Sequence, residues 1–184
     1  PLDGPGYSFD EVKTISNERT NVSYYENVRV PDAYRLGEVN QGVKVLAAAL
    51  SIEQGGDEYF PCTLEQLGLL GEACARVLDP SISDRNVREQ LAETMVRVNV
   101  GRALAARAIW AAANDCALKH YGPMAKLFCT ESLISCSTSL RAMFSQDVLF
   151  REEEPFDELR GLHLASLPST IYAGTSEVQR SLVA

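Results

Sequence analysis

The sequence is poor in positive charge. Its 184 residues include 17 Lys and Arg against 25 Asp and Glu, which gives a formal net charge of -8 at pH 7. Binding to the phosphate backbone of a nucleic acid requires a surface dominated by Lys and Arg. The charge balance therefore argues against nucleic acid as a partner.

Long hydrophobic runs are absent as well. No apolar stretch approaches the roughly 20 residues that span a bilayer. The N-terminal sequence PLDGPGYSFDEV lacks the basic residues and the apolar core of a secretory signal. We therefore expect a soluble, cytoplasmic protein that does not associate with a membrane.

Residues typical of metal and covalent chemistry are scarce. The two histidines, His120 and His163, have no informative neighbours in sequence and are expected to be surface or core residues. The cysteines are odd in number and form neither a CxxC pair nor a Cys/His cluster at zinc spacing. We predict no metal site and expect free, buried thiols at Cys62, Cys74, Cys116, Cys129 and Cys136.

A short strand-rich segment opens the chain. Several Pro and Gly residues punctuate the first forty positions, and residues 22–25 and 28–30 are rich in strand formers. Two short strands are predicted here. Because such a pair cannot be stable alone, we expect residues 1–38 to be the tail of a β-domain that chain outside this sequence completes.

Helical periodicity begins after Gly42. Val43, Leu46 and Leu50 fall on one face of a first helix, and Glu53 shares that face. The rest of the chain continues this pattern, so a mainly α bundle is predicted for residues 39–184.

Four further helices follow in the predicted bundle. They cover residues 63–78, with Thr63 as N-cap, residues 84–118, residues 123–144, and a last segment that begins near Thr175. In the third helix of the chain an Ala-rich part around Trp110 permits close packing. The acidic stretch 151–161 is predicted to be a connection. The apolar residues that keep the core period of the third helix are Val87, Leu91, Met95 and Val98.

A turn into a helix is predicted in the stretch IYAGTSEVQR, residues 171–180. Gly174 followed by Thr175 and Ser176 is typical of a capped helix start. Free N–H groups and the positive end of the helix dipole favour an anionic or carbonyl-bearing ligand there. The alternative, which local chemistry alone favours, is an ordinary capped helix without a ligand.

This stretch resembles the C-terminal signature of acyl-CoA dehydrogenases, commonly IYxGTSEIQRxIxA. A second stretch, VRVPDAYRLGEVNQGVKVLAAAL, is similar to the family's passage from its middle β-domain into the first helix of its C-terminal bundle. The resemblance covers essentially the whole chain. It implies that residues 1–38 end the middle β-domain and that residues 39–184 form the C-terminal four-helix-bundle domain.

The resemblance implies α,β-dehydrogenation of an acyl-CoA thioester, with FAD as cofactor and an electron-transfer flavoprotein as acceptor. In this reaction a carboxylate removes the α-proton while the β-hydrogen leaves as hydride. Many members carry that carboxylate in the signature, where this sequence has Ala173. Other members carry it on the first bundle helix, where counting without gaps gives Glu53. We therefore predict Glu53 as the base and the backbone N–H of Ala173 as a donor to the thioester oxygen.

The same resemblance assigns the remaining site residues. It places substrate contacts at Ser51, Gln54, Tyr172 and Gly174, and FAD contacts at Thr175, Ser176 and Glu177.

Some family features are missing. Gln54 stands where Arg is usual, VLDPSISDRN stands where the family has RQFGxPL, and RAMFSQDVLF stands where it has QxxGGxG. The last two motifs usually approach the FAD of a neighbouring subunit. The resemblance is therefore to actinobacterial heterotetramers, in which two different chains share each flavin and several of which act on steroid side-chain CoA thioesters.

We accordingly expect a bulky or branched acyl group and a second acyl-CoA dehydrogenase-like subunit, with a homo-oligomer as the alternative assembly. Two other functions stay open. In the first alternative, the chain is a non-catalytic structural subunit of such a complex. In the second, it belongs to an oxidase or monooxygenase that uses oxygen. Glu53 separates the catalytic from the structural hypothesis.

Overall fold

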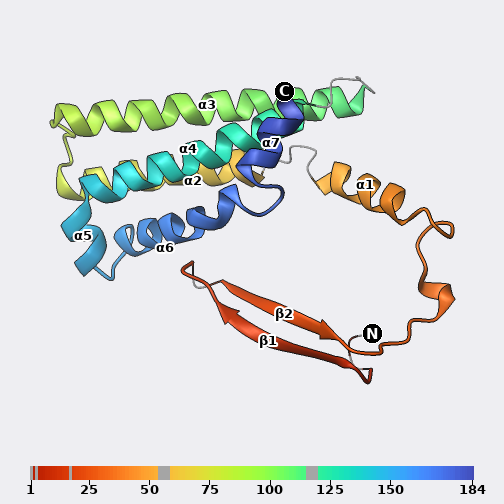
Figure 1. The fold of residues 1–184 in the computed structure, drawn as a ribbon. Coiled ribbons are helices and arrows are strands. Elements are labelled where there is room, and N and C mark those ends of the chain that lie inside the picture. Colours follow the sequence, from red (N-terminus) through yellow and green to blue (C-terminus); the bar gives the residue numbers. More distant parts are fainter. Residues whose placement is uncertain (1, 3, 17, 54–58, 115–119) are drawn as a thin grey trace. The chain divides into compact units, whose positions relative to one another are not determined.

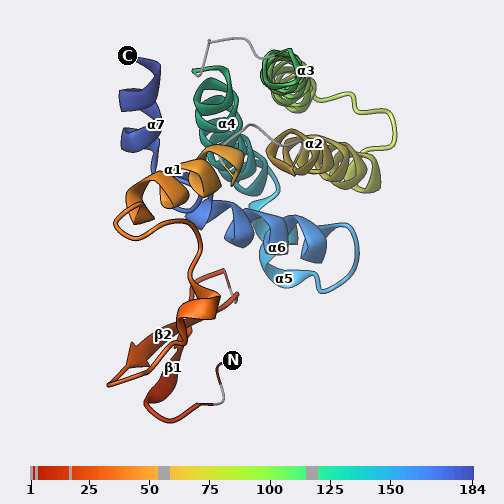
Figure 2. The same ribbon diagram turned by 90° about the vertical axis from the view of Figure 1, so that its right-hand side faces the viewer.

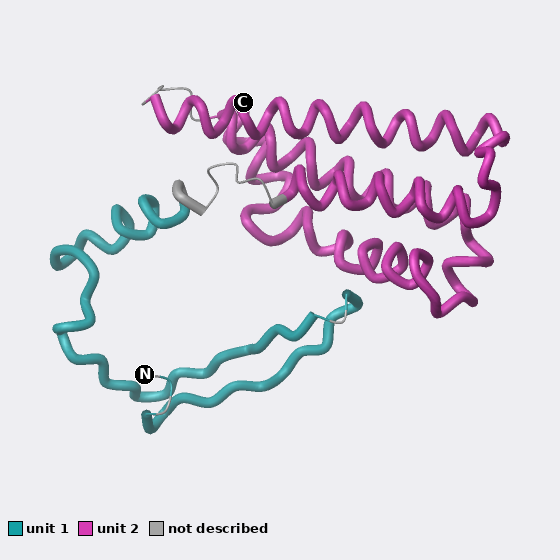
Figure 3. The backbone as a smooth tube through the Cα atoms, turned by 180° about the vertical axis from the view of Figure 1, so that it is seen from behind, with its two compact units in different colours: residues 1–52 teal, residues 53–184 magenta. Residues whose placement is uncertain are grey.

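The computed structural model describes residues 2, 4–16, 18–53, 59–114 and 120–184, without the side chains of residues 51–53 and 59. Two compact units, Pro1–Ile52 and Glu53–Ala184, make up the chain (Figure 3). The described residues contain seven α-helices and one two-stranded sheet (Figure 1), so the predicted mainly α class is confirmed. The predicted domain boundary after residue 38 stays a prediction.

The first unit begins with an antiparallel hairpin. Strands β1 (Tyr7–Lys13) and β2 (Arg19–Tyr25) pair with Tyr7 opposite Tyr25 and Lys13 opposite Arg19. The two tyrosine rings lie 5.3 Å apart, so an aromatic cross-strand pair stabilises the open end. Almost every residue of both strands is exposed.

One of the two strand predictions was wrong. Residues 22–25 lie in β2 as expected, but residues 28–30 form no strand. They follow Asn27, whose φ of 52° turns the chain out of the ladder, and they precede Pro31, which has no N–H to donate. The strand that pairs with β2 instead comes earlier in the sequence.

Helix α1 (Gly42–Glu53) begins where the periodicity predicted. It follows the short 3₁₀ turn η1 (Asp32–Tyr34). The apolar residues of α1 are exposed, with fractions of 84% for Val43, 58% for Leu46 and 39% for Leu50. The placement of Glu53 on the same face as these residues stays a prediction.

The second unit is a bundle of four main helices. These are α2 (Tyr59–Leu78), α3 (Arg85–Ala113), α4 (Tyr121–Met143) and α6 (Phe156–Ser166). Helix α4 contacts all three others, and α2 also packs against α3 and α6; Figure 2 shows the bundle nearly end-on. The largest fully buried side chains, including Leu64, Leu67, Leu140 and Phe156, lie between them.

Small residues let α3 and α4 approach closely, as predicted. Gly101, Ala105, Ala108 and Ala111 are buried along one face of α3. A Cβ atom added at Gly101 would lie 2.8 Å from the Sγ atom of Cys129 on α4. There is no room for a larger residue at this crossing.

The cysteines of the described residues are free. Cys74, Cys129 and Cys136 are buried in the bundle as expected, whereas Cys62 is exposed and Cys116 lies outside the described residues. Burial raises the pKa of the Cys74 and Cys129 thiols to about 12, which keeps them protonated and unreactive.

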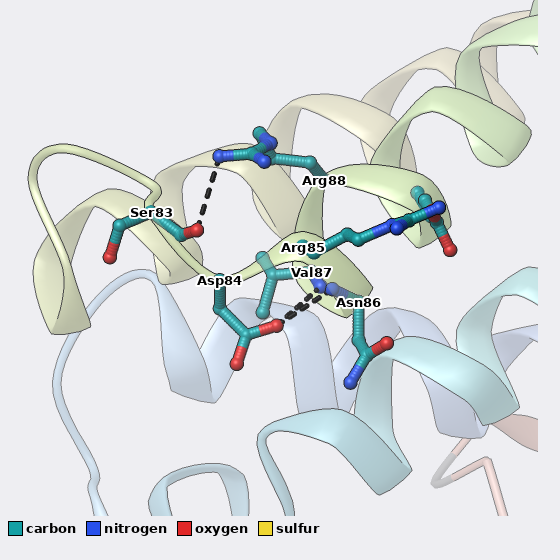
Figure 4. Close-up of polar contacts among 7 residues, drawn as sticks. Ser83, Asp84, Arg85, Asn86, Val87 and Arg88 are labelled. Carbon is teal, nitrogen blue, oxygen red and sulfur yellow. Dashed lines mark hydrogen bonds and ion pairs between the residues drawn. The ribbon is translucent and has the colours of Figure 1, made fainter.

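The start of α3 agrees with the sequence. Asp84 is its N-cap, and the carboxylate accepts hydrogen bonds from the N–H groups of Asn86 at 2.7 Å and Val87 at 3.2 Å (Figure 4). The Arg88 guanidinium donates to the Ser83 carbonyl at 3.1 Å in the same loop. The cap satisfies two N–H groups that have no partner inside the helix.

Other helix predictions need correction. Helix α2 begins at Tyr59, so Thr63 lies inside it and is not an N-cap. Short helix α5 (Ser145–Phe150) precedes α6, and residues 156–161 of the predicted connection are helical because Phe156 and Leu159 pack into the core. Met95 is 40% exposed and does not belong to the core.

Helix α7 (Ser176–Val183) ends the chain and packs against α4. Within the described ranges, no helix combines the length and apolar content that crossing a bilayer requires.

Candidate functional site

The conformation of the predicted signature is unusual. Residues 169–175, called the signature turn from here on, connect the 3₁₀ helix η2 (Leu167–Thr170) to α7. Ala173 has a φ of 53° and Gly174 a φ of 87°, so two consecutive residues are left-handed. This conformation costs an alanine about 1–2 kcal/mol, which means that other contacts must hold it.

Three carbonyl groups of the turn accept hydrogen bonds from two buried side chains. The ammonium group of Lys126, on α4, donates to the carbonyls of Ser169 at 3.0 Å and Gly174 at 2.7 Å. The amide nitrogen of Gln179, on α7, donates to the carbonyl of Ala173 at 2.8 Å. Lys126 is 4% exposed and Gln179 is fully buried, so these are interior contacts.

Aromatic and ionic contacts fix the turn from two further sides. The Tyr172 ring stacks on the ring of Phe60, on α2, with 5.9 Å between centroids. Arg180 forms an ion pair with Glu131, which ties α7 to α4. Helices α2, α4 and α7 therefore all contribute to the geometry of the signature turn.

The backbone N–H of Ala173 is left without an acceptor among the described residues. Its own carbonyl and that of Gly174 are both engaged by side chains. A free N–H donor on a fixed turn can stabilise a carbonyl oxygen as it gains negative charge. The donor role of Ala173 stays a prediction, but its backbone meets the requirement.

The start of α7 is a well-formed cap. The Thr175 hydroxyl accepts from the Val178 N–H at 3.3 Å. Hydrogen bonds to its own backbone N–H and to the Thr175 hydroxyl lower the pKa of the Glu177 carboxyl. This helix start therefore carries its own negative charge, which the helix dipole stabilises.

Several buried polar atoms near the turn have no partner. They are the hydroxyl oxygens of Ser169 and Ser176 and the amide oxygen of Gln179. Buried polar groups are normally paired, so these three atoms stand out among the described residues.

These observations fit part of a FAD site. Thr175 and Ser176 stand at a helix N-terminus, which favours a phosphate or a ring carbonyl. The Ser176 hydroxyl at this helix start is buried and has no partner among the described residues. The exposed carboxylate of Glu177 would repel a phosphate and suits a hydroxyl or amino group instead. The assignment of Thr175, Ser176 and Glu177 to FAD stays a prediction.

The structure brings only some predicted site residues together. Tyr172, Ala173, Gly174 and Thr175 lie in the signature turn, and Ser176 and Glu177 follow as the first residues of α7. Ser51 and Glu53 occupy the last turn of α1, but their side chains lie outside the described residues, as does Gln54 entirely. Their assignment to the site stays a prediction.

Two residues that shape the turn were missed. Lys126 and Gln179 were not singled out, although both are buried. A signal existed for Lys126, because it shares a helical face with Cys129 and Leu133, where a charged residue is unexpected.

Histidine and metal chemistry is not apparent at this site. His163 was expected to be a surface or a core residue, and it is a core residue. Its Nδ1 atom lies 3.1 Å from the Ser137 hydroxyl. In the portions of the chain that are described, no group of three His, Cys, Asp or Glu side chains is placed to hold a metal ion.

The fold and the turn define a class of protein: a helix bundle with a fixed, donor-bearing turn before its last helix. The family model described as "Acyl-CoA dehydrogenase, C-terminal domain" matches residues 73–184. The chain therefore belongs to the acyl-CoA dehydrogenase family.

Individual relatives agree with this family. The chain is 28% identical, over its full length, to acyl-CoA dehydrogenase FadE26 of Mycobacterium tuberculosis, of which it covers 48%. A variant of the Tcur3481-Tcur3483 steroid ACAD matches at 25% identity with a TM-score of 0.85, covering 100% of this chain and 49% of that one. Butyryl-CoA dehydrogenase from Megasphaera elsdenii shares the fold, with a TM-score of 0.83 at 19% identity over 98% of this chain and 49% of that one. The chain spans about half the length of the relatives it matches.

Proposed function

We propose that this chain is the C-terminal part of a catalytic subunit of a FAD-dependent acyl-CoA dehydrogenase. The observation that carries the proposal is the signature turn, in which Ala173 offers a free N–H and no titratable side chain. A turn of this kind can hold a thioester carbonyl but cannot accept a proton. The proton must therefore go to a carboxylate elsewhere.

Glu53 is the proposed proton acceptor. It ends α1, whose neighbouring face is apolar, and a carboxylate in apolar surroundings is a stronger base than one in water. It takes the α-proton of the thioester while the Ala173 N–H stabilises the negative charge that grows on the carbonyl oxygen. FAD, when bound, accepts the β-hydrogen as hydride.

The remaining predicted residues position the reactants. Tyr172 is 40% exposed beside Ala173 and presents an aromatic edge to the acyl-CoA, and Gly174 lets the backbone approach it closely. Ser51 and Gln54 are proposed to contact the same substrate from the end of α1. Thr175, Ser176 and Glu177 are proposed to contact FAD.

A bulky acyl group and a second subunit are part of the proposal. The relative named as a steroid ACAD is a pair of differently named chains, which supports both a steroid-like acyl thioester and a heteromeric assembly. The incomplete set of FAD contacts on this chain is consistent with a flavin shared between two chains. An electron-transfer flavoprotein is the proposed electron acceptor.

The test uses the full-length chain co-purified with its partner subunit. Anaerobic addition of a steroid side-chain CoA thioester should bleach the visible flavin absorbance, and a short straight-chain thioester should bleach it more slowly. No bleaching by any thioester would refute the dehydrogenase proposal. Oxygen uptake without an added acceptor would instead assign the chain to an oxidase.

The shared flavin is tested by expressing each full-length chain alone. We expect low flavin content in each chain and restored flavin in the co-expressed complex. If either chain alone purifies saturated with flavin, the shared site is wrong.

A further inference from the structure

Lys126 is a buried cation with an uncommon set of partners. Its side chain is 4% exposed on α4. Burying an ammonium group costs several kcal/mol unless it is hydrogen-bonded. Among the described residues Lys126 forms no ion pair, and Glu131, whose charge acts on it from a distance, is paired with Arg180. Its partners are two backbone carbonyls and the Phe60 ring, 5.8 Å from the ammonium nitrogen.

Both carbonyl partners belong to the signature turn. Ser169 and Gly174 lie on either side of Ala173, and one ammonium group holds both of their oxygens. A neutral side chain of similar length would fill the same space in the core at a lower cost of desolvation. The charge is therefore explained by what it does to the turn and not by packing.

Three hydrogen bonds restrict the backbone on both sides of the peptide that carries the Ala173 N–H. Gln179 fixes the carbonyl of Ala173 from α7, while Lys126 fixes the carbonyls that flank this segment from α4. Two consecutive left-handed residues would otherwise relax, because that conformation is unfavourable for Ala173. The direction of a catalytic donor determines its effect, and a displacement of about 1 Å can cost about a hundredfold in rate.

We propose that Lys126 is the positioning residue of the signature turn, which clamps the Ser169 and Gly174 carbonyls and so aims the Ala173 N–H at the thioester oxygen. This inference rests on the proposed function of Ala173. Burial lowers the pKa of Lys126, and Glu131 opposes that change; two carbonyl acceptors suit the ammonium form.

The experiment compares Lys126→Met with the wild type in the full-length assembled complex. The probe is an enoyl-CoA product labelled with ¹³C at its thioester carbonyl, and the readout is the infrared stretch of that carbonyl in the bound state. In the wild type the stretch should move to lower frequency than in solution, because the Ala173 N–H donates to it. In Lys126→Met most of this shift should be lost, and kcat should fall about a hundredfold with a small change in KM.

Ser137→Ala is the matched control. Ser137 is buried on the same helix and bonded to His163 and Ser166 of α6, neither of which belongs to the signature turn. Its loss should lower the thermal midpoint while the carbonyl shift and kcat stay close to wild type. If the Ser137→Ala complex loses the carbonyl shift as Lys126→Met does, the effect of Lys126→Met reflects a general loss of stability. That outcome would overturn the inference.

Further outcomes separate the two proposals. A wild-type complex that bleaches with acyl-CoA, together with a Lys126→Met complex that keeps the shift and kcat, overturns the positioning role alone. A wild-type complex that neither bleaches nor shifts the carbonyl overturns both proposals. If Lys126→Met does not fold, Lys126→Gln decides: its amide can donate to one carbonyl, so an intermediate shift supports the clamp and a wild-type shift overturns it.

Discussion

At the residue scale, His163 occupies a buried polar network. Its Nδ1 atom lies 3.1 Å from the Ser137 hydroxyl, which also lies 3.0 Å from the hydroxyl of Ser166. The Ser166 hydroxyl donates to the His163 carbonyl at 2.7 Å. Burial, and to a lesser extent the positive charge of Arg141, lowers the pKa of His163 from its ordinary value of 6.5. The fold therefore favours the neutral imidazole.

This network predicts a loss of stability in acid. Because the folded-state pKa is lowered, the unfolded chain takes up the proton first. The contribution of His163 is complete above its ordinary value of 6.5 and is lost as the pH falls from there through the folded-state pKa. Thermal midpoints measured from about pH 7.5 to about pH 5.5 should fall, and His163→Asn should flatten part of that slope.

His120→Asn is the control for this prediction. His120 lies outside the buried network, with its ring 4.8 Å from that of Tyr121. Its replacement should leave the slope unchanged. An equal flattening by both variants would contradict the assignment to His163.

Local signals predicted part of the candidate site. The order of Gly174, Thr175 and Ser176 predicted a capped helix, because a Thr or Ser side chain can accept a hydrogen bond from an N–H group of the helix that it begins. Lys126 and Gln179 could not be assigned in the same way. Their effect depends on the packing of α4 and α7 against a turn that is distant from Lys126 in sequence.

At the element scale, the crossing of α3 and α4 depends on Gly101. Gly101→Ala should destabilise the full chain by about 1 kcal/mol, because overpacking outweighs the gain in helix propensity. The clash is with the Sγ atom of Cys129, 2.8 Å from the added Cβ. The double variant with Cys129→Ala lacks that sulfur and should recover most of the lost unfolding free energy, as measured by chemical denaturation.

Gly161 provides the opposite case. It lies within α6, where an added Cβ would meet nothing within 4 Å. Gly161→Ala should stabilise the chain by about 0.5–1 kcal/mol. If Gly101→Ala raises the unfolding free energy as Gly161→Ala does, the inferred close approach of α3 and α4 is wrong.

The cap of α3 gives another prediction at this scale. Asp84→Ala removes the acceptor for the Asn86 and Val87 N–H groups and should cost about 1 kcal/mol of unfolding free energy. Asp84→Asn keeps an oxygen acceptor and should cost much less. Equal losses in the two variants would show that the charge, and not the cap geometry, matters.

Elements with strong local signals were the ones predicted from sequence. The starts of α1 and α3 follow a clear period or cap residue, and both were found. The acidic residues around Pro155 predict a connection where the structure has the first turns of α6. Its Phe156 and Leu159 are fully buried against the other helices, so tertiary packing decides this segment.

At the scale of the whole molecule, our proposal makes the chain one part of a larger site. It spans 48% of FadE26 and about half of the solved relatives. Its signature turn offers the Ala173 N–H as a donor, and its proposed base lies at the end of another helix. On our proposal, catalysis also requires the rest of the subunit and a partner that completes the flavin site.

The replacement of Glu53 by Gln tests the central claim most directly. In the full-length complex, Glu53→Gln should retain its flavin and still bind acyl-CoA, but the thioester should no longer bleach the flavin absorbance, because no group removes the α-proton. Glu58→Gln, a nearby acid of the same type, should bleach like the wild type. Bleaching of the Glu53→Gln complex at the wild-type rate would contradict the account and leave this chain a structural subunit.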